Sequence, residues 1–133
     1  MKLTTKSEYT LLLLLAMVRR SGGGPIHLNE LARETEVPLK YAEQLFALLK
    51  KARIVNAKRG VSGGYRLMRP PHLITLAEVI RLMDGALAPT EAVSKYFFSH
   101  TPLEKEEKLL KVFREIRNYV SDRLESLSLA DMA

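Results

Sequence analysis

Apolar residues recur at helical spacing along most of this chain. Residues 11–18 read LLLLLAMV, which predicts a helix buried on most of its sides. Thr5 and Glu8 have the spacing of a capping box, so the helix is expected to begin at Thr5. It is expected to end near Arg20, before the glycines at 22–24. The apolar run is far shorter than the roughly 20 residues that cross a bilayer, so we interpret it as a central core helix.

Two shorter helices are predicted next, separated by Val37 and Pro38. Proline is well accommodated in the first turn of a new helix, so it marks the start of the second one. The first runs from His27 to about Glu34. The second covers LKYAEQLFALLKKA at 39–52 and aligns a stripe of Ala42, Leu45, Leu48 and Leu49. This spacing fits a helix-turn-helix or an ordinary helical hairpin equally well.

The segment after these helices predicts a β-hairpin and decides between the two alternatives. Residues 54–58 and 65–67 are β-prone runs separated by RGVSGG, with basic residues beside the glycine-rich tip. A helix-turn-helix followed directly by a basic hairpin is a winged helix. In that fold the second helix enters the major groove of DNA, and the hairpin reaches phosphates or the minor groove.

The tip sequence GVSGG at 60–64 also matches G-x-S-x-G, the turn that presents a nucleophilic serine in many hydrolases. That turn requires a helix directly after the serine, whereas YRLMRPP follows here and cannot begin a helix of useful length. The glycines are therefore expected to allow positive φ and close approach to a sugar–phosphate backbone. Ser62 is at most a phosphate hydrogen-bond donor, and no enzyme activity is expected.

Two more helices are predicted in the second half of the chain. Thr75 and Glu78 form a second capping box for a helix that ends before Gly85. Residues 85–100 show no clear period and are expected to be loop, or a short helix around 90–97. A third capping box at Thr101 begins a long helix that extends to about Leu127.

The apolar stripe of this long helix predicts a subunit interface, because it is long relative to the small winged domain. It includes either Val112 or Phe113 and either Tyr119 or Val120. We expect a symmetric dimer, although the helix could also fold back on its own core. The expected interface residues are Leu109, Phe113, Ile116, Val120, Leu124 and Leu127.

Charge and composition limit the classes of partner and cofactor that this protein can bind. The net charge is +6, and between Lys40 and Arg69 the many basic residues are accompanied by Glu43 as the only acid. This distribution favours nucleic acid or a membrane surface as partner, although many basic proteins bind neither. No cysteine is present, which excludes disulfides and thiolate-held metal clusters. No signal-peptide cleavage pattern follows the apolar run, so a cytoplasmic location without membrane binding is expected.

The order of motifs carries a family resemblance. It runs MKLTTKSEY, YAEQLFALLKKARIV, RGVSGGYRL and ITLAEVIRLMDG, followed by the long helix. The chain resembles the Rrf-two family of bacterial winged helix-turn-helix transcription regulators, closely over 1–85 and in general character over 101–129. The resemblance implies a mainly α fold with a small β-hairpin. It implies a winged DNA-binding domain at 1–85, a connecting or effector-region loop at 86–100, and a dimerisation helix and tail at 101–133.

The resemblance further implies a homodimeric regulator, acting as a repressor, that binds a pseudo-palindromic operator in double-stranded DNA. Gln44 can pair with adenine, Glu43 can accept from cytosine N4, and Arg59 suits a narrow minor groove. Glu43 could instead be solvated or paired with Lys40, and Tyr41 could pack its ring on the helix. The expected DNA-binding residues are Thr4, Thr5, Lys6, Lys40, Tyr41, Glu43, Gln44, Lys58, Arg59, Gly60 and Ser62.

Two departures from the family pattern stand out. Arg53 stands where the family usually has glycine, and positive φ there would cost about 1 kcal/mol, which a phosphate contact could offset. Cluster-binding members carry cysteines in the segment corresponding to about 85–105, whereas this chain has none, so no cofactor is expected. Glu8 is interpreted as a capping residue, although some members place a cluster ligand there. The scattered histidines show no metal-ligand spacing.

The sequence is compatible with more than one kind of signal and more than one class of partner. The aromatic segment 96–98 could line a pocket for a small-molecule effector, contact a protein effector, or pack the loop on the dimer. The alternative function is a winged-helix interaction module that docks a protein or RNA partner instead of duplex DNA.

Overall fold

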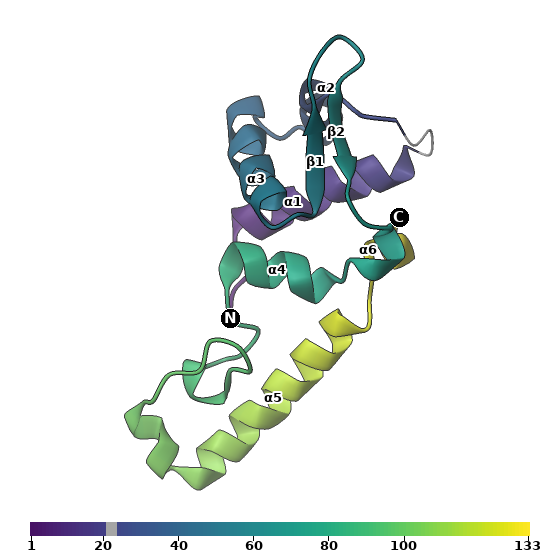
Figure 1. Ribbon diagram of the computed structural model, residues 1–133. Helices are drawn as coiled ribbons and strands as arrows, with labels where there is room; N and C mark the ends of the chain where they lie inside the picture. The colour runs from purple at the N-terminus through teal and green to yellow at the C-terminus, as the bar shows by residue number, and fades with distance from the viewer. Residues whose placement is uncertain (21–23) are drawn as a thin grey trace.

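A computed structural model describes residues 1–20 and 24–133 and shows a mainly helical fold with one β-hairpin (Figure 1). Three helices come first, α1 (Thr5–Arg19), α2 (Leu28–Thr35) and α3 (Leu39–Lys51). The predicted stop at Gly22 and Gly23 lies outside the described residues. The strands β1 (Val55–Lys58) and β2 (Gly64–Leu67), a 3-10 turn η1 (Pro71–Leu73) and helix α4 (Leu76–Asp84) follow. The chain continues through η2 (Glu91–Val93), η3 (Pro102–Lys105), α5 (Glu107–Glu125) and α6 (Leu129–Met132).

Helix α1 forms the centre of the winged domain, as its apolar sequence predicts. It packs against α2, α3, α4 and α6. Leu13 and Leu14 are fully buried together with Leu31 of α2 and Phe46 of α3. Burial of such a side chain contributes about 1.5–3 kcal/mol relative to exposure, so this cluster holds the helices together. One leucine of the run, Leu12, remains 47% exposed.

The hairpin is antiparallel, with Val55 opposite Leu67 and Lys58 opposite Gly64. Ile26 forms a bridge with Tyr65, and each donates its backbone amide to the other's carbonyl at 2.8 and 2.7 Å. The Tyr65 ring stacks edge-on against Phe46, with ring centroids 4.9 Å apart. The hairpin is therefore anchored to both the segment before α2 and the core side of α3.

The predicted helix starts prove right at one position and wrong at two. The hydroxyl of Thr75 accepts a hydrogen bond from the Glu78 amide at 3.1 Å, so Thr75 caps α4 as expected, but the Glu78 side chain pairs with Arg69 and does not complete the capping box. Thr5 is already helical, and Thr4 holds the N-cap position without a side-chain cap bond. The third predicted start at Thr101 opens only the 3-10 turn η3, and the long helix begins at Glu107. Leu103 of η3 packs against a small cluster containing Val93 and Leu110, and this tertiary contact accompanies the break.

The long helix α5 projects away from the winged domain as an arm (Figure 1). The chain between α4 and α5 lies along one side of this arm. Helix α5 ends at Glu125, short of the predicted Leu127, because the chain turns back toward the winged domain. The Leu127 carbonyl accepts from the Leu76 amide at 2.9 Å, and Leu129 of α6 is fully buried in the main core. The last residues therefore pack on the first domain instead of extending the arm.

Candidate nucleic-acid interface

Helix α3 turns its predicted DNA-reading residues outward. Lys40, Glu43 and Gln44 are exposed, while the opposite side of the helix is buried in the core. Within the described part of the chain no ion pair joins Glu43 to Lys40. The predicted core stripe is right for Ala42, Leu45 and Leu49, but Leu48 is 36% exposed and Phe46 is buried. The exposed face thus presents a carboxylate, an amide and cations, which are the groups that read base edges and phosphates.

Tyr41 occupies an intermediate position between the core and the exposed face. Its ring packs edge-on against Tyr9 of α1, with ring centroids 5.5 Å apart, and the residue is partly buried. The Tyr41 ring is therefore packed against a neighbouring helix, in line with the alternative that it packs instead of contacting DNA. The contact fixes the start of α3 against α1.

The glycines at the hairpin tip have a steric role. Gly60 has φ of 105°, and its carbonyl accepts from the Gly63 amide at 3.0 Å. A Cβ on Gly63 would overlap the Lys58 carbonyl oxygen and lie 2.8 Å from the Gly60 carbonyl oxygen. Gly64 has φ of 129°, and a Cβ there would lie 2.5 Å from the Ile26 carbonyl group. Strand β2 follows Ser62 where a nucleophile turn needs a helix, so the G-x-S-x-G match reflects hairpin geometry.

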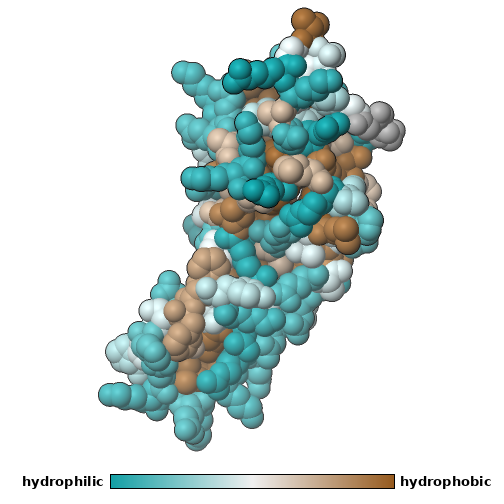
Figure 2. Space-filling model, in the orientation of Figure 1, coloured by the Kyte–Doolittle hydropathy of each residue, from teal (hydrophilic) through white to brown (hydrophobic). Residues whose placement is uncertain are grey.

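The tip is exposed and cationic. Lys58, Arg59, Gly60 and Ser62 are all exposed, and Val61 at the end is 99% exposed. Figure 2 shows mainly hydrophilic side chains over this end of the molecule, with one apolar protrusion at the top. A hairpin with cations beside an apolar tip suits insertion into a DNA groove, where the cations can meet the sugar–phosphate backbone.

At the start of α1, where phosphate contacts are expected, Thr4 is bonded to the end of α4. The amide of Thr4 donates to the Asp84 carboxylate at 2.9 Å, and the Thr4 hydroxyl also donates to that carboxylate. Ser7 donates to it at 2.8 Å. Burial opposes ionisation of Asp84, but the bonds from Thr4 and Ser7 outweigh it and lower the pKa of this carboxyl. Both donors of Thr4 are therefore engaged, whereas Thr5 and Lys6 are exposed beside them.

Arg53 adopts the backbone conformation that its replacement of glycine predicts. Its φ is 60°, in the left-handed region, and its side chain is exposed after the end of α3. Glu36, at the turn between α2 and α3, is the second residue other than glycine with positive φ in the described chain, at 59°. Both positions carry a local strain that glycine would relieve.

The predicted interface stripe of α5 divides between two environments. Phe113 packs on the cluster around Val93, and Val120 and Leu124 pack beside α4. Leu127 is partly buried beyond the end of the helix. Leu109 and Ile116 remain exposed. The exposed apolar line on α5 consists of Leu109, Val112, Ile116 and Tyr119. Val112 and Tyr119 follow the same three- and four-residue spacing. This spacing alone allowed either Val112 or Phe113, and either Tyr119 or Val120, to belong to the stripe.

A polar cluster joins α4, α5 and the connecting segment. Arg81 of α4 donates to Ser121 at 3.2 Å and to Glu125 at 2.7 Å, both on α5. The bond from Arg81 outweighs burial and, together with one that the Ser121 hydroxyl donates to Glu125 at 3.2 Å, lowers the pKa of Glu125. The Arg81 guanidinium also lies over the Tyr96 ring, 4.6 Å from its centroid. Tyr96 thus contacts α4 through Arg81, but like Phe97 and Phe98 it is exposed.

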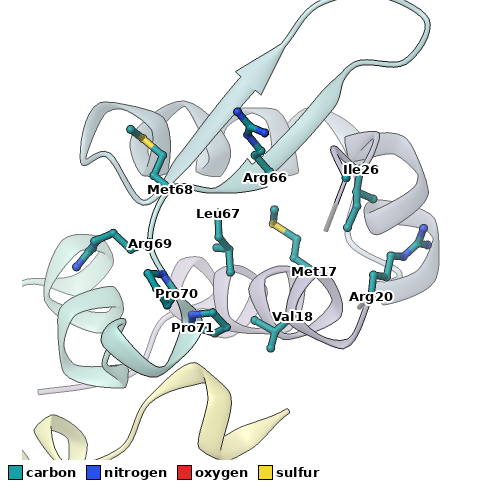
Figure 3. A pocket seen from close by; sticks show the side chains of 11 residues that line it. Met17, Val18, Arg20, Ile26, Arg66, Leu67, Met68, Arg69, Pro70 and Pro71 are labelled. Carbon is teal, nitrogen blue, oxygen red and sulfur yellow. The ribbon is translucent and has the colours of Figure 1, made fainter. Parts of the chain in front are cut away.

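A cavity of about 470 Å³ lies between the end of α1 and the base of the hairpin (Figure 3). Its wall includes Met17 of α1 and Leu67 of β2, and arginines lie at its edge. Arg20 pairs with Glu30 and Glu34, and Arg69 pairs with Glu78. The residues that line this cavity do not include the aromatic segment 96–98, where an effector pocket is one expectation.

No helix among the described residues is long and apolar enough to cross a membrane.

A helix-turn-helix followed by an exposed cationic hairpin defines a winged helix-turn-helix DNA-binding protein. The profile of the Rrf2 family, described as "Iron-dependent Transcriptional regulator", matches residues 3–133. The chain belongs to the Rrf2 family. This confirms the resemblance read from the motifs, the fold class and the assignment as a DNA-binding transcription regulator and not an enzyme.

Relatives and solved structures agree with this assignment. The chain is 31% identical to CymR of Bacillus subtilis over 133 residues, covering 100% of this chain and 90% of CymR. It is 30% identical to IscR of Vibrio campbellii over 139 aligned residues, covering 99% of this chain and 77% of IscR. The structure of CymR, described as the global cysteine regulator of B. subtilis, superposes with a TM-score of 0.80, covering 100% and 96% of the two chains. That of T. potens IscR gives 0.71 at 30% identity, covering 99% and 85%.

The family description names iron, and the residues of this chain can be tested for an iron site. The sequence contains no cysteine to supply a thiolate. Among residues 1–20 and 24–133, no three His, Asp or Glu side chains gather closely enough to hold a metal ion. The donor set that a thiolate-held cluster requires is therefore not present in this chain.

Proposed function

We propose that this protein is a cytoplasmic transcriptional repressor that binds a pseudo-palindromic operator as a homodimer and does so without an iron–sulfur cluster. The observation that carries the proposal is that α3 and the hairpin are packed together through the core and that each exposes its expected DNA-binding residues. Phe46 and Tyr65 join the two elements through the core, while Gln44 and Arg59 are both exposed. One protomer can therefore place a helix in the major groove and a cationic finger beside it.

Base recognition is assigned to α3 and to the tip. Gln44 would pair with adenine and Glu43 would accept from cytosine N4, because both side chains extend from the exposed face of α3. Arg59 would enter a narrow minor groove, where the negative potential is strongest. Lys40, Lys58, Thr5 and Lys6 would meet phosphates, with Gly60 and Ser62 close to the backbone. Thr4 would act indirectly, by holding the start of α1 through Asp84.

The dimer is assigned to α5. Leu109, Val112, Ile116 and Tyr119 form an apolar line that this chain leaves exposed along the arm. Two such lines related by a two-fold axis would bury each other, and a two-fold dimer matches a palindromic operator. The connecting segment with Phe97 and Phe98 is the proposed position for a small-molecule or protein effector, because it contacts both α4 and α5 through Arg81 and Lys95.

The test is selection of genomic DNA fragments by the purified full-length protein, followed by footprinting on the enriched sequence. The expected result is an inverted repeat protected on both half-sites, with affinity that falls steeply between 50 and 200 mM salt. Arg59→Ala should weaken binding and reduce the preference for A·T pairs in the minor groove. Absence of any footprint, with salt-insensitive capture of a protein or RNA, would support the interaction module instead.

A further inference from the structure

His27 contacts the hairpin tip, although it precedes α2 in the sequence. Its ring is exposed, and Nε2 lies 3.2 Å from the backbone carbonyl oxygen of Val61. A carbonyl oxygen only accepts hydrogen bonds, so the Nε2 hydrogen is the donor. The contact crosses 34 residues of sequence and reaches the most exposed part of the wing.

The contact extends an existing backbone pairing toward the tip. Ile26, the preceding residue, exchanges two backbone hydrogen bonds with Tyr65. Gly64 lies so close to the Ile26 carbonyl and the His27 amide that a side chain would not fit between them. Residues 26 and 27 therefore run beside the end of β2, and the His27 ring reaches past it to Val61.

The position of this contact matters because the tip is otherwise held locally. The turn closes through the Gly63 amide and the Gly60 carbonyl, and Gly60 has the conformational freedom of a positive-φ glycine. Arg59 directly precedes this turn. Ordering a mobile loop on binding reduces affinity, and a loop held in its bound conformation avoids that loss.

We propose that His27 is a positioning residue for DNA recognition, which fixes the wing tip through the Val61 carbonyl so that Arg59 is presented to the minor groove. The inference rests on the proposed function, in which Arg59 makes that contact. His27 itself need not touch DNA. Its effect on affinity should therefore depend on the presence of Arg59.

A double-mutant cycle tests this dependence with the full-length protein and an operator duplex obtained by the selection above. Affinities of the parent, His27→Ala, Arg59→Ala and the double variant are measured by fluorescence anisotropy. His27→Ala should weaken binding about three- to ten-fold in the parent, the range that one hydrogen bond gives. It should weaken binding less than about two-fold when Arg59 is already alanine.

Two further variants separate positioning from other roles. His27→Gln retains a side-chain donor and should recover most of the lost affinity, while His72→Ala, at an exposed histidine of η1, should leave affinity unchanged. Thermal unfolding of each variant checks that the fold is retained. Equal losses in both Arg59 backgrounds, or no recovery with glutamine, would overturn the positioning role. Unchanged affinity of Arg59→Ala alone would instead overturn the proposed wing contact.

Discussion

Thr4 and Asp84 are 80 residues apart in sequence, yet the Asp84 carboxylate accepts hydrogen bonds from both the backbone amide and the hydroxyl of Thr4. Asp84 is the last residue of α4, and Thr4 directly precedes α1. The first turn of a helix has amide groups without helical partners and a partial positive charge, so a carboxylate stabilises it. In this protein the α1 cap is thus supplied by a distant helix, and α4 and the start of α1 are joined.

Replacing Asp84 with asparagine should lower stability by about 1 kcal/mol, because the amide keeps one accepting oxygen but loses the negative charge and one acceptor at the start of α1. The folded-state pKa of Asp84 is lowered from its ordinary 3.8, so its contribution is present at neutral pH and lost as the pH falls through that lowered value. Urea unfolding of parent and variant should therefore differ at pH 7, and the difference should shrink only as the pH falls below 3.8 and through the lowered pKa. Asp122→Asn, at an exposed acid of α5, is the matched control. A pH-independent difference would contradict the role of the ionised carboxylate.

Gly63→Ala should disrupt the wing, because the added Cβ would overlap backbone atoms of Lys58 and Gly60. Backbone atoms in a tight turn cannot move aside cheaply, and we expect a loss of about 1–3 kcal/mol in stability. Operator affinity should fall more than ten-fold. Ser62→Ala is the control, with unchanged stability and at most a small loss of affinity. Labelling of Ser62 by a fluorophosphonate probe would contradict the steric interpretation of this motif.

Arg53→Gly should raise the free energy of unfolding by up to about 1 kcal/mol, because glycine relieves the strain at φ of 60°. If Arg53 offsets its strain by a phosphate contact, the same variant should weaken operator binding several-fold. Glu36→Gly relieves the same strain at φ of 59° without removing a cation. It should be equally stabilised and bind at least as well as the parent. Unchanged affinity of Arg53→Gly would show that the arginine makes no contact with DNA.

Ile116→Glu should convert the proposed dimer to a monomer without unfolding it, because Ile116 is 44% exposed in the single chain and a charged side chain there can remain in solvent. Light scattering coupled to size exclusion measures the mass directly. Operator affinity should fall more than ten-fold, because two linked half-site contacts become one. Arg114→Glu introduces the same side chain at an exposed position outside the apolar line and should remain dimeric. A dimeric Ile116→Glu protein would place the interface elsewhere.

Local patterns were sufficient for most of the winged domain. The apolar run in α1, the stripe of α3 and the glycine-rich hairpin tip can each be recognised from a few consecutive residues. The Thr75 cap and the positive φ of Arg53 follow from the same short-range chemistry. Such features are visible in the sequence because helix periodicity, capping and backbone freedom depend on only a few consecutive residues.

Long-range contacts decided the rest. Spacing placed Phe113 and Ile116 on one predicted stripe, but packing against η2 and η3 buries part of the first and leaves the second exposed. The Thr5 capping box was locally plausible, yet Asp84 supplies the cap through Thr4. The same applies to the contact of His27 with Val61. The order of residues is enough to indicate which faces are apolar and where the chain turns. The partner that each face and each donor finds depends on the folded molecule, because folding brings those partners together across tens of residues.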